Sequence, residues 1–245
     1  MNIVFITNGD STIGYGHVSR TLMLYTFLKK QNHDLKIIVP QSCTFSVNED
    51  FKKVKSFSRG DLDFIEKDYE IVIIDSVELD YDLLSWLRDS NLFVVTITLF
   101  LFDLAKRYEN ISFFPSIGGS EIIKAGETEI FIGNKYLTLR DEFAKTNFTV
   151  RPNANKILIT MGGTDPYSLC IKALNSLKND TSLTITVLLS EKAKDYQELK
   201  EISKFNDNAP HECDLDCGVL NSAVLIIKGA KSIVRPFINL SLIPI

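Results

Sequence analysis

Seven apolar, β-branched segments recur along the chain, and polar stretches with helical periodicity lie between them. The segments are residues 3–7, 35–39, 71–75, 93–98, 157–161, 183–189 and 224–227. Each is apolar at consecutive positions, which is typical of parallel strands buried on both faces. Helical faces follow the first and fifth segments, and they consist of Val18, Leu22, Tyr25 and Leu28, and of Leu169, Ala173, Leu174 and Leu177. The alternation predicts an α/β fold.

A polar stretch around residues 145–155, interrupted by Pro152, breaks this pattern. Linkers between domains have such a composition. We therefore expect an N-terminal domain over residues 1–148 and a C-terminal domain over residues 149–245. Each opens with a strand, a glycine-containing loop and a helix.

Charge and hydropathy narrow the class of protein. The 27 basic residues against 31 acidic ones give a net charge of −4. A general nucleic-acid binder needs a basic face, so we expect no nucleic-acid partner. The longest apolar run, residues 92–102, is far shorter than the ~20 residues that span a bilayer, and the N-terminus lacks a basic leader. We therefore expect no membrane association.

The four cysteines are scattered along the chain, which favours free thiols in a reducing cytoplasm over a disulfide framework. His211, Cys213 and Cys217 are close enough in sequence to suggest metal ligands. A structural zinc site would need a second pair of ligands, so we interpret this segment as a polar loop and expect no metal.

The first candidate site follows the first segment. Gly14, Tyr15, Gly16 and His17 lead into the first predicted helix. The glycines allow close approach of a ligand, and the helix would direct its first amides at an anion. Ser19 stands where a dinucleotide-binding Gly-x-Gly-x-x-Gly motif needs its third glycine. His17 is either a catalytic group at a strand's carboxyl end or a polar helix cap.

The second candidate site follows the fifth segment, where Gly162, Gly163, Thr164 and Asp165 precede Pro166. We expect Thr164 or Asp165 to cap a helix that has Pro166 in its first turn. Such a loop can cradle a phosphate. It lacks the Gly-Lys-Ser/Thr of a P-loop, so ATP hydrolysis is not indicated.

Taken together, these motifs resemble the nucleotide-sugar hydrolases of the pseudaminic acid pathway and, more distantly, MurG-type glycosyltransferases. Further segments similar to that family are the strand that ends at Asp75, the later Tyr81, the phrase Gly133-Asn134-Lys135-Tyr136-Leu137-Thr138-Leu139-Arg140-Asp141-Glu142-Phe143, and Ser232 near a second phosphate loop. The resemblance implies a GT-B-like fold, in which two Rossmann-like domains flank a cleft.

The resemblance also implies an activity, the release of UDP from a diacetamido-trideoxy sugar by water attack at the anomeric carbon, without a cofactor or metal. His17 would then activate or position the water, and the 162–165 loop would stabilise the diphosphate. Arg20 and Asp75 are either contacts to the sugar or to His17, or surface ion-pair partners. The product would serve synthesis of surface glycans, such as those on flagellin.

Several positions depart from the family's pattern. Ser76 stands where the family has a histidine, Pro115 replaces an asparagine, Pro236 replaces a glutamate, and residues 98–102 are apolar in place of an acidic pair. The chain also ends near a last strand, so we expect a shortened second domain. A homodimer is a further alternative. A glycosyltransferase and a non-catalytic UDP-sugar-binding relative remain the alternatives to a hydrolase.

Overall fold

The computed structural model consists of two compact units, residues 1–146 and 147–245. It describes residues 1–10, 13–43, 49–76, 80–97, 106–116, 121–139, 155–162, 165–177, 180, 182–191 and 193–202, together with the backbone of 203–204, 222–228 and 231–237. The predicted linker lies mostly outside these residues, as does the predicted boundary between residues 148 and 149. In the described part of the chain, no helix has the length and apolar character to cross a membrane.

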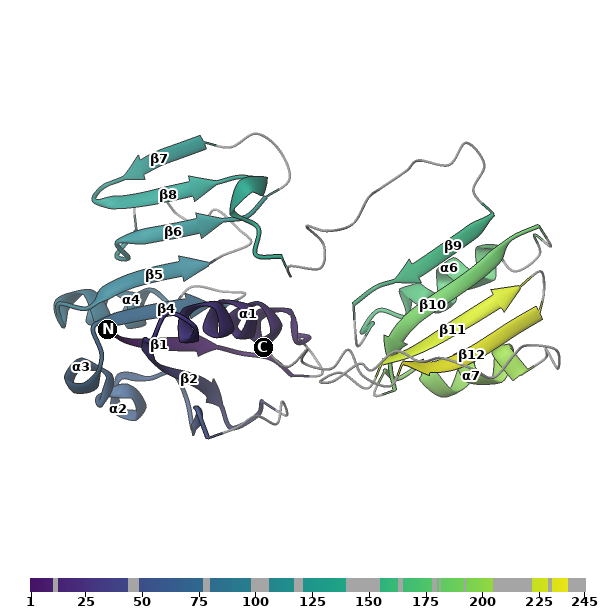
Figure 1. The fold of residues 1–245 in the computed structure, drawn as a ribbon, viewed down its shortest axis with the longest axis horizontal. Helices are drawn as coiled ribbons and strands as arrows, with labels where there is room; N and C mark the ends of the chain where they lie inside the picture. The colour runs from purple at the N-terminus through teal and green to yellow at the C-terminus, as the bar shows by residue number, and fades with distance from the viewer. Residues whose placement is uncertain are drawn as a thin grey trace. The chain divides into compact units, whose positions relative to one another are not determined.

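The first unit is built on a sheet of eight strands in the order β3-β2-β1-β4-β5-β6-β8-β7 (Figure 1). The strands are β1 (Asn2–Thr7), β2 (Asp34–Pro40), β3 (Phe51–Val54), β4 (Ile71–Asp75), β5 (Phe93–Ile97), β6 (Ile111–Phe114), β7 (Glu121–Ala125) and β8 (Thr128–Ile132). All neighbours pair in parallel except β7 and β8, which pair antiparallel. The predicted mixed α/β class with a mostly parallel sheet is confirmed.

Helices lie on both faces of this sheet. Helix α1 (Gly16–Lys29) lies against β1, β2 and β4, in front of the sheet in Figure 1. Side chains of α2 (Arg59–Leu62), α3 (Ile65–Asp68) and α4 (Tyr81–Asp89) join a core with Val4, Ile6, Val72 and Val94 on the opposite face. We call the two faces the α1 face and the α4 face.

Local sequence explains where α1 and α4 form. In α1, Val18 and Tyr25 of the predicted apolar stripe are buried against the sheet. In α4, the Asp80 carboxylate accepts hydrogen bonds from the amides of Asp82 and Leu83 at 3.0 and 3.1 Å, which satisfies two free donors of the first turn.

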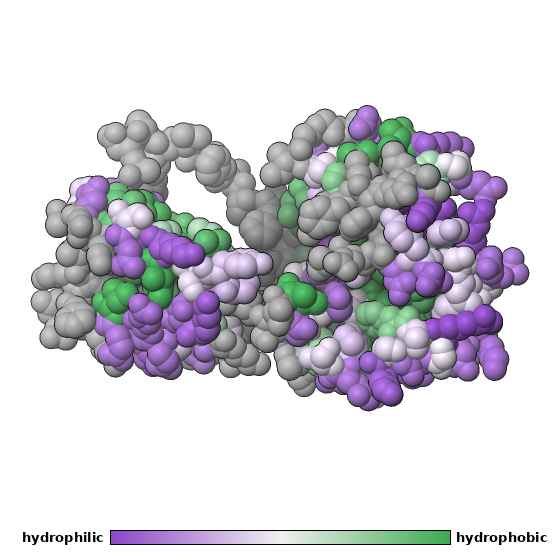
Figure 2. Space-filling view, turned by 180° about the vertical axis from the view of Figure 1, so that it is seen from behind, coloured by the Kyte–Doolittle hydropathy of each residue, from purple (hydrophilic) through white to green (hydrophobic). Residues whose placement is uncertain are grey.

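The second unit has a smaller sheet in the order β12-β11-β10-β9. Its elements are β9 (Lys156–Thr160), α6 (Leu169–Leu177), β10 (Thr184–Ser190), α7 (Tyr196–Lys204), β11 (Ser222–Lys228) and β12 (Lys231–Phe237). Strands β9 and β10 are parallel, whereas β10, β11 and β12 are antiparallel to their neighbours. Ile159, Cys170, Leu174, Ile185 and Leu199 belong to its buried core. Hydrophilic and hydrophobic residues are interspersed on the described surface of both units (Figure 2).

All seven predicted strands exist; residues 71–75 match β4 without a shift, and the ends of the others differ by at most two residues. The prediction that residues 224–227 form a parallel strand was wrong, because β11 runs antiparallel to β10. The apolar run could not distinguish the two orientations, since a strand buried on both faces has the same composition in either. Strands β3, β6, β7, β8 and β12 were missed because each is short or interrupted by charged residues or proline.

Candidate functional site

His17 and Asp75 meet at the carboxyl edge of the large sheet. His17 is the second residue of α1, and Asp75 is the last residue of β4. Register pairs Asp75 with Thr7, the last residue of β1, so both strands end at the same edge. The exposed fractions are 6% for His17 and 1% for Asp75. Ligand sites of open α/β sheets lie at this edge.

Asp75 holds both His17 and Arg20. Its Oδ1 atom lies 2.6 Å from Nδ1 of His17, and its Oδ2 atom accepts a 2.7 Å hydrogen bond from Nε of Arg20. A second guanidinium nitrogen, Nη2, donates to Oδ1. The sequence left Arg20 and Asp75 between a site role and a surface ion pair. The structure places them in a largely buried cluster around His17.

The contacts fix the position of the imidazole proton. Asp75 accepts two hydrogen bonds from the Arg20 guanidinium, and a carboxylate so bound can only accept from His17 as well. The 2.6 Å contact therefore requires a proton on Nδ1 of His17. In the neutral ring Nε2 then carries the lone pair, and no group of the described residues bonds to it. Such a nitrogen can accept a proton from a substrate or water.

The loop before α1 is shaped by its glycines. Gly14 has a φ of +82°, and its amide donates to the Asp10 carbonyl at 2.9 Å. Only glycine adopts this φ without strain. A Cβ at the buried Gly9 would lie 2.7 Å from Val18, so this position also excludes a side chain. Gly16 has open space around it, and Tyr15 is the half-buried residue before the helix.

The second predicted loop is described only in part, because Gly163 and Thr164 lie outside the described residues. Gly162 has a φ of +75°. Asp165 is 2% exposed, and its carboxylate accepts from the amides of Leu169 and Cys170 at 2.9 and 2.7 Å. The Asp165 side chain therefore caps the first amides of α6, but α6 begins at Leu169, so Asp165 is not at the predicted N-cap position directly before the helix.

Two expectations about the predicted phosphate-binding segments differ from the structure. Pro166 lies ahead of α6 instead of in its first turn, because the Asp165 carboxylate reaches amides four and five residues along the chain. Ser232 lies in β12, where register pairs it with Ile227, and not in a loop. Substrate contacts by these loops stay predictions. His211, Cys213 and Cys217 lie outside the described residues.

Sequence reasoning missed a second buried ion pair. Arg107 and Glu109 form it beside β5 and β6, and their side chains are 1% and 0% exposed. Hydroxyls of Thr96 and Ser112 bond to this pair. Both residues lie just before β6, and no sequence motif marks their positions. Register places Thr96 and Ser112 in one row with Ile74 and Ile6, which face away from α1.

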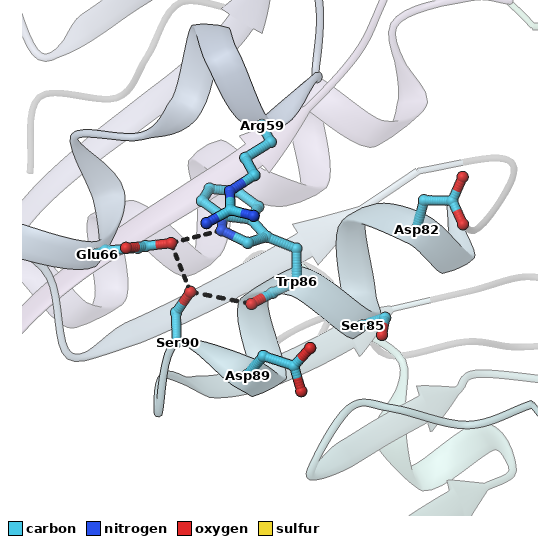
Figure 3. A pocket seen from close by; sticks show the side chains of 7 residues that line it. All are labelled: Arg59, Glu66, Asp82, Ser85, Trp86, Asp89 and Ser90. Atoms are coloured by element: carbon cyan, nitrogen blue, oxygen red, sulfur yellow. Dashed lines mark hydrogen bonds between the residues drawn. The ribbon is translucent and has the colours of Figure 1, made fainter.

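A hollow of about 380 Å³ lies between α2, α3 and α4 (Figure 3). It is lined by Arg59, Glu66, Asp82, Ser85, Trp86, Asp89 and Ser90. Glu66 accepts from Nε1 of Trp86 at 2.5 Å and from Oγ of Ser90 at 2.7 Å. The Ser90 bond, followed by the Trp86 bond, lowers the pKa of Glu66. These groups tie helices together on the α4 face, away from His17.

Comparison with known proteins gives one relative and no family. No protein-family model matches the chain. An uncharacterized protein of Methanocaldococcus jannaschii is 30% identical to it over an alignment of 226 residues. The alignment covers 83% of this chain and 46% of the archaeal protein, so the chain spans about half the length of this relative.

Proposed function

We propose that this chain hydrolyses a UDP-linked diacetamido-trideoxy sugar and releases UDP and the free sugar. The observation that carries the proposal is the buried His17–Asp75 contact, which leaves Nε2 as a base at the carboxyl edge of the sheet. The order of motifs supports the sugar-nucleotide substrate by resemblance. The pathway would be the cytoplasmic synthesis of a pseudaminic-type acid for surface glycans.

In this reaction a water molecule donates a proton to Nε2 of His17 while its oxygen bonds to the anomeric carbon. The bond from that carbon to the diphosphate oxygen breaks, and UDP leaves with the bonding electrons. Asp75 stabilises the imidazolium that forms, and Arg20 keeps Asp75 ionised and oriented. The resemblance assigns the diphosphate to backbone amides of the 162–165 loop. The first amides of α6 are not assigned to it, because they already donate to Asp165.

The test measures UDP release from UDP-2,4-diacetamido-2,4,6-trideoxyhexoses with a coupled assay. His17→Ala should lower turnover by roughly 10²- to 10⁴-fold, the usual contribution of a general base. His33→Ala is the matched control, because His33 lies directly before β2 and is far in sequence from the described contacts of His17, Arg20 and Asp75. Turnover that survives His17→Ala would refute the role of His17.

Other outcomes separate the alternatives. UDP release only when a sugar alcohol is added, with a disaccharide as product, would identify a glycosyltransferase. Calorimetric binding of UDP without turnover would identify a non-catalytic relative, which the replacements at Ser76 and Pro236 would explain. Neither binding nor turnover would reject the whole proposal.

A further inference from the structure

Strand register places Asp75 of the candidate site in a row of residues that crosses four strand boundaries. The row consists of Thr7, Asp75, Ile97, Phe113 and Phe131, each paired with the next. Residues paired in this way point to the same face of a sheet. The row therefore lies on the α1 face and changes from polar at Asp75 to aromatic at Phe113 and Phe131.

Three rings gather at the aromatic end of the row. Phe113 and Phe131 stack with centroids 5.3 Å apart and an interplanar angle of 28°. The ring of Tyr136, in the short helix η1 (Asn134–Tyr136) after β8, lies 5.8 and 5.4 Å from them. All three side chains are half-buried. We call Phe113, Phe131 and Tyr136 the aromatic platform.

The platform is not explained by packing under a helix. On the α1 face, the main contacts of α1 are with β1, β2 and β4, and no described helix makes comparably extensive contacts with β6 or β8. Phe114, the neighbour of Phe113, instead packs with Ala125, Ile130 and Ile132 on the other face. Strand β6 thus presents one phenylalanine to a small core and one to the platform.

We propose that the aromatic platform binds the sugar ring of the substrate and selects hexoses that carry methyl and acetamido groups. This inference rests on the proposed function. Phe113 lies two strand spacings from Asp75, about 10 Å at the usual separation of strands. A sugar whose anomeric carbon is near His17 would therefore extend toward the rings.

The chemistry of the rings accounts for the selection. Phe113 and Phe131 stack on each other, and the apolar aromatic surface that they still present packs well against the methyl and C–H groups of a pyranose. A hexose with hydroxyls in place of methyl and acetamido groups would lose water from those hydroxyls against Phe113 and Phe131, whose rings offer no conventional hydrogen bond in return. The platform thus favours the deoxygenated, acetylated sugar over the fully hydroxylated one.

The experiment compares Phe113→Leu and Phe131→Leu with the control Phe114→Leu. Leucine keeps an apolar side chain but removes the ring, and the control makes the same change on the opposite face of β6. The platform variants should raise KM for the UDP-linked diacetamido sugar roughly three- to tenfold, from the usual worth of an aromatic pair. Affinity for UDP alone, measured by calorimetry, should not change.

A second measurement does not depend on turnover. Titration with the free 2,4-diacetamido-2,4,6-trideoxyhexose should shift ring-proton NMR signals of Phe113 and Phe131, and glucose should not. Hydrolysis with unchanged KM in both platform variants would overturn the platform while the proposed function stands. Ring shifts without hydrolysis would reject the function and keep the platform. Absence of ring shifts with the free sugar, in a wild type that does not hydrolyse the UDP-sugar, would overturn both.

Discussion

The change Asp75→Asn should move the proton of His17 from Nδ1 to Nε2. An amide offers one acceptor where the carboxylate offers two. If the amide oxygen accepts from Nε of Arg20, the amide NH₂ faces Nδ1 of His17. Nη2 of Arg20 is already 3.1 Å from that Nδ1 atom and can donate to it once its proton is gone. Every donor is then satisfied only if Nδ1 becomes an acceptor.

Two magnitudes follow from this rearrangement. With the proton on Nε2 the base is lost, and the same change in Ser-His-Asp triads lowers turnover about 10⁴-fold. The first unit also loses a charge-assisted hydrogen bond and the neutralising charge for Arg20. Bonds to charged groups contribute about 1.5–3 kcal/mol. The Arg20 side chain keeps 16% exposure, so water compensates in part, and we expect the first unit to lose about 2 kcal/mol.

The assay is ¹⁵N NMR of the imidazole rings, which distinguishes the two neutral tautomers whatever the protein's activity. The chain has three histidines, so a spectrum of His17→Ala assigns the signal. UDP release from the sugar nucleotide is measured on the same samples. Glu109→Gln is the matched control, because it removes a carboxylate of the same unit that is 0% exposed and does not contact His17.

Glu109→Gln should destabilise the first unit by a similar amount and leave the His17 tautomer and the turnover near those of the wild type. A folded Asp75→Asn variant whose His17 keeps its proton on Nδ1 would refute the placement of the proton. Equal losses of turnover in both variants would show that destabilisation, and not the tautomer, explains the effect.

Three further changes test the rest of the structure. Burial, and then the hydrogen bond to Asp50, raises the pKa of Tyr25 above 10.0. The first unit should therefore lose thermal stability as the pH rises through that raised value. In thermal melts, Tyr25→Phe should lose less stability over the same pH range, because it has no hydroxyl to ionise. Burial raises the pKa of Cys170 to about 12, so mass spectrometry should find it alkylated by iodoacetamide at neutral pH only after denaturation. Gly162→Ala, at φ +75°, should cost the second unit about 1 kcal/mol in urea unfolding, whereas Gly60→Ala, in open space with an ordinary φ in α2, should cost nothing.

The predictable parts of the fold are those in which local pattern and final packing agree. Residues 71–75 are apolar up to a terminal aspartate, and they form β4 in the centre of the sheet. Strand β7 (Glu121–Ala125) escaped prediction because it is an edge strand with charged residues, which pairs only with β8. Its place depends on a partner elsewhere in the chain, which no local window contains.

The same distinction applies to the site. His17 was found because a glycine-containing loop and a helix start mark its position. The role of Asp75 stayed open because it depends on β4 lying beside β1, a pairing between residues far apart in sequence. Phe113 and Phe131 were missed for the same reason, since only the register of β6 and β8 brings their rings together.

Burial of charge alone does not identify the site. Arg107 and Glu109 are buried as deeply as Asp75, and Nε and Nη1 of Arg107 have no partner among the described residues, but these atoms are donors that cannot act as a base. Substitution of a buried ion pair by apolar residues often leaves stability unchanged, so stability does not require either cluster to be charged. His17 differs because Asp75 occupies only one of its two ring nitrogens, at the edge where strands of parallel sheets end. A ring nitrogen directed by a buried carboxylate and without a partner in the described part of the chain contributes nothing to folding, and this is the physical reason to assign chemistry to His17.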